Sequence, residues 1–172
     1  FFLGFAVGLF AVAAICLLIA FIAKSNQKEN CYDERQKYFR SKAIQAAYAV
    51  LVVYLILYGM LNSVYGIQWF DNFTGSFIGI CLSITVFAVI CILNDAYVKF
   101  QEKPGQTIIL FAFLSIVNLG LGFVNVFVRK TCYTNGQLNF DCINLVAGIA
   151  LLIILVVFIP KQLIDKRNST AE

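Results

Sequence analysis

The sequence predicts an all-α polytopic integral membrane protein, a helical bundle of five transmembrane helices with its N-terminus outside and its C-terminus cytoplasmic. Three observations support this prediction: an apolar composition, five long apolar runs, and basic residues in every second connection. Of 172 residues, 61% are hydrophobic and 13% are charged, against about 25% charged in a soluble domain. The mean hydropathy is +0.85. We expect one transmembrane domain over 1–172, multi-pass in the plasma membrane.

Each apolar run is long enough for the bilayer core, which about 20 helical residues cross. The expected spans are 1–23, 43–62, 74–93, 107–128 and 145–164. The first opens on Phe1 without a basic flank and is interpreted as an anchor rather than a cleavable signal. Pro160 falls near the end of the fifth span, where water can satisfy the carbonyl that a proline leaves unbonded.

Basic residues orient the chain because short loops rich in Lys and Arg stay in the cytoplasm. Six of them lie between the first two spans: Lys24, Lys28, Arg35, Lys37, Arg40 and Lys42. The connection 63–73 has none. The other predicted inner segments carry Lys99, Lys103, Lys161, Lys166 and Arg167. Arg129 and Lys130 oppose the scheme on the predicted outer side, but they are outnumbered.

The connection 31–42 predicts a cytoplasmic helical extension of the second span. Asn30 can cap a helix, with Asp33 in its first turn and Lys37 four residues further on. No Gly or Pro lies between Asn30 and Gly59. The second span is therefore expected to be the upper part of one helix that begins near Cys31 and projects about three turns from the membrane.

Two short motifs in this part of the chain resemble a known group of proteins. Asp-Glu-Arg-Gln at 33–36 precedes Arg-Ser-Lys-Ala at 40–43, and Asp-Ala-Tyr at 95–97 follows the third span. This pattern resembles small multi-spanning membrane proteins of Gram-positive bacteria whose function is uncharacterised. The resemblance covers the middle half of the chain, and that group has Gly where Ser41 stands. It implies a bacterial plasma membrane and supplies no activity.

The predicted outer loop 131–142 contains the clearest turn signal. Asn135-Gly136 favours a type I′ hairpin, since both central residues of that turn need positive φ. Cys132 and Cys142 bracket the turn, and on an oxidising face they are predicted to form a disulfide. The alternative is two unpaired thiols. The chain has no His and no cysteine spacing typical of zinc, so we predict no metal and no cofactor.

Neutral polar residues within the spans allow two interpretations. Tyr54 and Tyr58 lie one turn apart on the second span, and Asn118 and Asn125 lie seven apart on the fourth. They could line a path for a neutral solute, or they could form interhelical hydrogen bonds, with the tyrosines bonded to the asparagines across the bundle. Small residues at 75, 79 and 83 predict a ridge for close helix approach, either internal or at a dimer seam.

Several function classes are disfavoured. No acidic residue lies inside a predicted span, which argues against energised ion transport. Without His or a nucleophile–base pair, we predict that the protein is not an enzyme. The net charge of +4 fits topology and anionic headgroups rather than nucleic acid. Charged groups at 33–35, 95 and 99 form either a metal-phosphate site or, as we favour, a salt-bridge patch between the long helix and the third span.

We therefore predict a non-enzymatic integral membrane protein that acts through partners, as a complex subunit or as a membrane regulator or sensor. Besides the lipid bilayer, the expected partner is a second copy of the chain or another membrane protein. The predicted contact surface is the cytoplasmic face formed by Asp33, Glu34, Arg35, Gln36, Arg40, Asp95 and Tyr97. The alternative is a small transporter or channel for a neutral solute, using Tyr54, Tyr58, Asn118 and Asn125.

Overall fold

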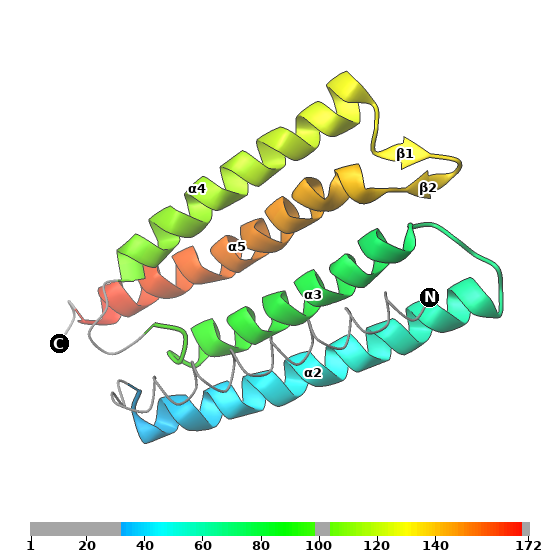
Figure 1. Cartoon of the computed structure of the whole chain (residues 1–172). Coiled ribbons are helices and arrows are strands. Elements are labelled where there is room, and N and C mark those ends of the chain that lie inside the picture. Colours follow the sequence, from blue (N-terminus) through cyan, green and yellow to red (C-terminus); the bar gives the residue numbers. More distant parts are fainter. Residues whose placement is uncertain (1–31, 99–103, 170–172) are drawn as a thin grey trace, which may run out of the picture.

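The computed structural model describes residues 32–98 and 104–169, which are mostly helical (Figure 1). The long helices are α2 (Glu34–Ser63), α3 (Asn72–Leu93), α4 (Pro104–Phe123) and α5 (Ile143–Ser169). Between α4 and α5 lie a π-helical segment η2 (Val124–Arg129), the strands β1 (Tyr133–Thr134) and β2 (Gln137–Leu138), and a 3₁₀ turn η3 (Phe140–Cys142). Four segments in this part of the chain are long and apolar enough to cross a membrane. The expected span 1–23 lies outside the described residues.

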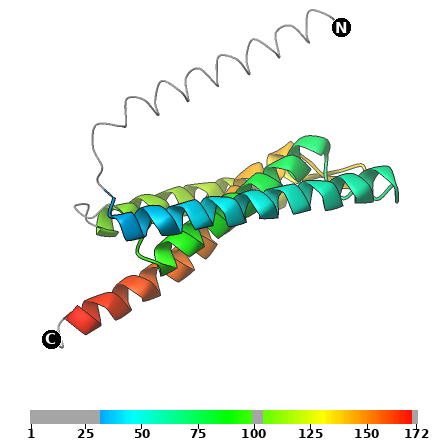
Figure 2. The same ribbon diagram turned by 90° about the horizontal axis from the view of Figure 1, so that it is seen from below.

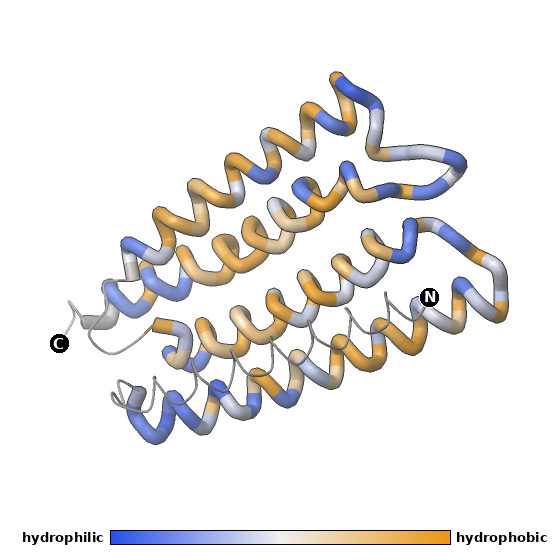
Figure 3. Tube along the Cα trace, viewed as in Figure 1, coloured by the Kyte–Doolittle hydropathy of each residue, from blue (hydrophilic) through white to orange (hydrophobic). Residues whose placement is uncertain are grey.

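Successive helices run in opposite directions and form a row in the order α2, α3, α5, α4 (Figure 1). α3 packs against both α2 and α5, whereas α4 packs mainly against α5. Seen from below, the C-terminal part of α5 extends away from the other helices (Figure 2). Apolar residues line each helix, and polar residues gather at both ends of the helices (Figure 3). This pattern fits helices whose outward faces contact lipid.

The second expected span and its extension form one continuous helix, as predicted from Glu34 onward. α2 runs from Glu34 to Ser63, and its N-cap is Asp33, whose carboxylate accepts a hydrogen bond from the Glu34 amide. The prediction that Asn30 begins this helix is therefore wrong. Asp33 takes that role because its extended backbone and short carboxylate suit the cap position, with φ −62° and ψ 156°.

The predicted ridge of small residues on α3 packs inside the molecule against α2. Added Cβ atoms at Gly75 and Gly79 would collide with the rings of Tyr58 and Tyr54. One turn further, the Ser83 hydroxyl donates a 2.9 Å hydrogen bond to the Ala47 carbonyl. The two glycines thus provide the space in which the tyrosine rings lie, and this ridge is used within one chain.

α4 and α5 also meet through small residues. An added Cβ at Gly122 would lie 2.7 Å from Leu145 Cα, and one at Gly148 would lie 2.8 Å from Leu119 Cγ. The buried Ser115 hydroxyl donates a 3.1 Å hydrogen bond to the Gly148 carbonyl. α5 includes Pro160 and continues to Ser169, beyond the expected end at 164. Proline therefore does not end this helix, although it removes one backbone hydrogen bond from it.

Two clusters of buried apolar side chains lie at the same end of the helices, where α2 begins and α3 ends. One cluster contains Ala88, Ile92, Ile154 and Phe158 of α3 and α5. A second contains Ala43, Cys91 and Ala96, where α2 meets the end of α3. Both clusters adjoin the turn that follows α3, which is where the sequence motif at 95–97 lies. The motif therefore lies beside both clusters of buried apolar side chains.

Candidate functional site

The turn after α3 has a geometry that its sequence explains. Asp95 adopts a left-handed backbone conformation, with φ 57°. The Ala96 amide donates to the Cys91 carbonyl at 2.8 Å, and the Asp95 amide donates to the Ile92 carbonyl at 3.2 Å. These two bonds form a Schellman motif, which satisfies the last carbonyls of a helix. Glycine is the usual residue at the left-handed position, and Asp is among the residues that tolerate it.

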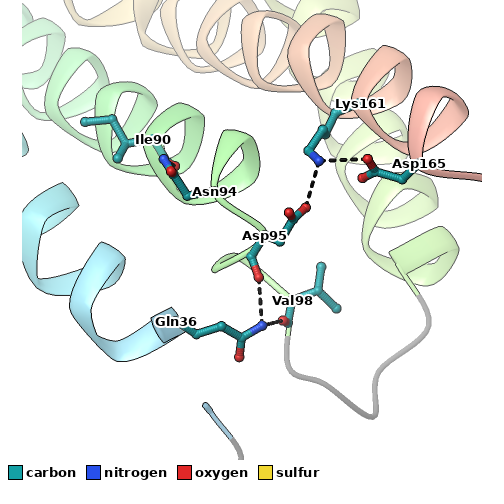
Figure 4. Close-up of polar contacts among 7 residues, drawn as sticks. All are labelled: Gln36, Ile90, Asn94, Asp95, Val98, Lys161 and Asp165. Carbon is teal, nitrogen blue, oxygen red and sulfur yellow. Dashed lines mark hydrogen bonds and ion pairs between the residues drawn. The ribbon is translucent and has the colours of Figure 1, made fainter. Parts of the chain in front are cut away.

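α2 binds this turn through two side chains of its own motifs, of which Figure 4 shows Gln36. Gln36 Nε2 donates to the Asp95 carbonyl at 2.7 Å and to the Val98 carbonyl at 3.5 Å. One turn along, the Arg40 guanidinium donates to the Ala96 carbonyl at 3.2 Å. It also lies 4.4 Å from the centre of the Tyr32 ring, within the range of a cation–π contact. The first turns of α2 are thus fixed to the end of α3.

α5 binds the same turn through a lysine that the sequence analysis did not single out. Lys161 Nζ lies 3.0 Å from Asp95 Oδ1 and 2.7 Å from Asp165 Oδ1 (Figure 4). Lys161 and Asp165 have the i,i+4 spacing of an ion pair on one helix face. This spacing is the feature of the sequence that could have identified Lys161 as a paired residue. We call Gln36, Arg40, Asp95, Ala96, Val98 and Lys161 the Asp95 junction.

Tyr97 is partly buried against α4 and α5 rather than fully exposed on the predicted contact surface. Its ring centre is 5.9 Å from that of Phe111 on α4 and 5.8 Å from that of Phe158 on α5, both edge-on. Burial raises the pKa of the Tyr97 phenol above its ordinary value. The Asp-Ala-Tyr motif therefore connects α3 to the other three long helices through backbone carbonyls, a carboxylate and an aromatic ring.

The predicted cytoplasmic contact residues consequently divide into two groups. Gln36, Arg40, Asp95 and Tyr97 make contacts within the molecule, although part of the Asp95 side chain stays exposed. Asp33, Glu34 and Arg35 lie exposed at the start of α2. The expected salt-bridge patch between α2 and α3 takes another form. α2 donates hydrogen bonds to carbonyls of the turn, and the ion pair to Asp95 comes from α5.

The four residues of the alternative solute path do not come together. Tyr54 donates to the Gly75 carbonyl at 2.8 Å and Tyr58 to the Asp71 carbonyl at 3.2 Å, both at the contact between α2 and α3. Asn118 donates to the carbonyl of Leu114 on its own helix at 2.8 Å. The Asn125 amide donates to the Asp141 carbonyl at 3.0 Å. The predicted bonds between tyrosines and asparagines are therefore wrong, since α2 and α4 are at opposite edges of the row.

The predicted hairpin is present without the predicted disulfide. Asn135 and Gly136 have φ values of 53° and 82°, as a type I′ turn requires, and Tyr133 pairs with Leu138. Cys132 and Cys142 are buried free thiols. Cys142 Sγ lies 3.3 Å from the Cys132 carbonyl oxygen, to which it donates. One hydrogen bond from the Asn139 side chain to the Thr131 carbonyl, together with backbone bonds, constrains the loop instead.

Comparison of the chain with protein-family models, with curated proteins and with solved structures found no match in any of the three.

Proposed function

We propose that the chain is a non-enzymatic, multi-pass protein of the bacterial plasma membrane that acts through a protein partner, as a complex subunit or as a membrane regulator or sensor. One observation carries this proposal. Glu34 and Arg35 are exposed on the first turn of α2, while the next residue, Gln36, fixes that turn to α3 through its 2.7 Å bond to Asp95. The two exposed charges are therefore presented on a fixed surface.

A fixed, charged helix end suits recognition of a partner. Side chains that are already positioned lose less conformational entropy on binding, which leaves more of the interaction energy for affinity. Adjacent charges of opposite sign select a partner of complementary pattern and disfavour partners that place like charges opposite them. The partner is then a membrane protein, or a second copy of this chain, that carries the complementary pair at the same membrane surface.

The topology that we propose has five spans, including 1–23, with the N-terminus outside and the C-terminus cytoplasmic. The described charges support it. Arg35, Lys37, Arg40 and Lys42 lie in the first turns of α2 and Lys166 and Arg167 near the end of α5, whereas the connection from α2 to α3 has no Lys or Arg. Because neighbouring helices are antiparallel, these basic segments lie at the same end of the helices, as the positive-inside rule requires of a cytoplasmic face.

Exchange of the two exposed charges tests the proposed contact. The double variant Glu34→Arg, Arg35→Glu keeps the net charge of the chain but reverses the pattern on α2. We expect it to lose co-purification of the native partner from solubilised membranes, because each charge then meets a like charge. The measurement is affinity purification of tagged chains followed by quantitative mass spectrometry.

The matched control is Arg129→Glu. It reverses the charge of an exposed residue at the other end of the helices from Glu34 and Arg35. It should leave the co-purified proteins unchanged. Thermal unfolding of each variant in detergent verifies that the fold is kept. If the exchanged pair recovers the same proteins in the same amounts as the native chain, the proposed contact is wrong.

A further inference from the structure

A cavity of about 340 Å³ lies at the other end of the helices from the Asp95 junction. It is bounded by the start of α3, the segment η2, the hairpin and the start of α5. Most of its surface is apolar, and the residues that matter below are Thr74, Val126, Lys130, Cys132, Cys142 and Val146. Its volume is within the range of about 300–1,000 Å³ that is typical of ligand sites.

The local structure of α4 explains why a cavity forms here. Gly122 brings α4 so close to α5 that an added Cβ would lie 2.7 Å from Leu145 Cα. Directly afterwards the chain changes to the π-helical segment η2, a wider turn that is frequent at functional sites. The segment ends at Lys130, whose φ is 56° and whose amide donates to the Asn125 carbonyl. Val126 of this segment and Lys130, its C-cap, both line the cavity.

One polar group of the lining indicates what kind of ligand fits. Thr74 is fully buried and is not accessible to a ligand, so the charge of the lining comes from Lys130. Lys130 is exposed, and within 32–98 and 104–169 the structure pairs it with no carboxylate. The site thus offers an apolar space and one cation.

We propose that this cavity binds one acyl chain of an anionic phospholipid. The apolar wall accommodates the chain, and Lys130 pairs with the phosphate. A small neutral solute would leave Lys130 unused, and a free hydrophilic anion would leave the apolar wall unfilled. In the topology proposed above, this binding also gives a reason for a lysine on the outer side, where the orientation rule disfavours it. The proposal does not depend on the contact at Glu34 and Arg35.

Native mass spectrometry of the purified chain in detergent tests the charge requirement. The chain is titrated with phosphatidylglycerol or with phosphatidylcholine of the same acyl composition. We expect one phosphatidylglycerol per chain and roughly tenfold weaker binding of phosphatidylcholine, because the charge-assisted contact is weakened. Lys130→Gln should remove this preference. The matched variant Arg129→Gln should keep it, because Arg129 does not line the cavity. Equal affinity of the native chain for both lipids would overturn the proposal.

A second pair of variants on α5 tests the cavity itself. Val146→Phe places a larger side chain in the lining and should abolish the bound phosphatidylglycerol. Val156→Phe makes the same change at a residue that is 65% exposed and outside the lining, and it should retain the lipid. Equal occupancy in both variants would contradict the assignment of the site.

Thiol alkylation decides the matter if Val146→Phe does not fold. Cys132 and Cys142 line the cavity, whereas Cys81 does not. In the native chain, phosphatidylglycerol should slow alkylation of Cys132 and Cys142 by a small reagent and leave the rate at Cys81 unchanged, as peptide mapping by mass spectrometry would show. If alkylation of the three cysteines responds equally to the lipid, the acyl chain does not occupy this cavity.

Discussion

Three aspartates at helix ends show how much one residue type can do in this chain. Asp33 caps α2, Asp95 closes α3 in a left-handed conformation, and Asp71 caps the start of α3. For Asp71, burial opposes ionisation, but hydrogen bonds from the Thr74 amide and side chain and from the amides of Phe140 and Phe73 outweigh that effect. They hold the pKa of the carboxyl below its ordinary value of 3.8. Ionised Asp71 therefore stabilises the folded state.

Substitution of Asp71 should separate the cap from its charge. Asp71→Ala should lower the free energy of unfolding by about 0.5–2 kcal/mol, because the cap is lost, whereas Asp71→Asn should cost less, since Asn also caps helices. The native chain should lose stability as the pH falls below 3.8 through the lower folded pKa, because the unfolded state binds the proton first.

Thermal unfolding in detergent at neutral and acid pH measures both effects. Asp71→Asn should lack the part of the acid destabilisation that comes from this carboxyl. If the Ala and Asn variants unfold at the same temperature at neutral pH, Asp71 does not act as a cap.

At the level of residues, sequence reasoning identified the motif positions but not their partners. Gln36, Arg40 and Asp95 were expected on a contact surface, yet their side chains hold helices together. The reason is that hydrogen bonds from side chains to carbonyls of a distant turn leave no pattern in the local sequence. The pairing of Lys161 with Asp95 likewise leaves no pattern in the local sequence, because it depends on how α5 packs against α3.

At the level of elements, strong local signals predicted the structure well. The expected extension 31–42 with its span 43–62 matches α2, and the expected span 74–93 matches α3, each with bounds that differ by only a few residues. The Asn135-Gly136 turn is confirmed. The segment η2 was not predicted, because a π-helix has no distinctive composition. Its wider turn matters for the site, since Asn118 and Asn125 would share a face only on a continuous α-helix.

Close packing between α2 and α3 leads to a prediction about two glycines. Gly79→Ala places a Cβ 2.5 Å from Tyr54 Cδ1 and should destabilise the chain by about 1–3 kcal/mol through overpacking. Gly59→Ala is the matched control on α2, because nothing lies within 4 Å of its added Cβ. There the change should be neutral or should stabilise by up to about 1 kcal/mol. Thermal unfolding in detergent compares the two, and equal effects would show that the Gly79 contact is not tight.

At the level of the whole molecule, apolar runs predicted which segments are helices but not which helices are neighbours. Pairing the tyrosines of α2 with the asparagines of α4 assumed a closed bundle. The structure is a row in which α3 and α5 lie between them (Figure 1). Helix order depends on which small-residue surfaces fit together, such as Gly122 with Leu145, and a single sequence does not pair those surfaces.

The proposed orientation can be tested by thiol accessibility at opposite ends of the helices. Thr134→Cys lies in the hairpin and Arg167→Cys near the end of α5, and both positions are exposed. A membrane-impermeant maleimide should label Cys at 134 in intact cells and Cys at 167 only after permeabilisation, with peptide mapping to exclude native cysteines. The opposite result would reverse the proposed topology.

The row consists of two successive helical hairpins, and this has a consequence for how the chain is made. α2 and α3 form their mutual contacts, such as the bond from Tyr54 to the Gly75 carbonyl, without any residue of α4 or α5. The ion pair at Asp95, by contrast, requires Lys161 of the last helix. We therefore expect the first hairpin to insert and pack while the ribosome is still synthesising the second. The Asp95–Lys161 pair then joins the two hairpins only after α5 has been synthesised and inserted.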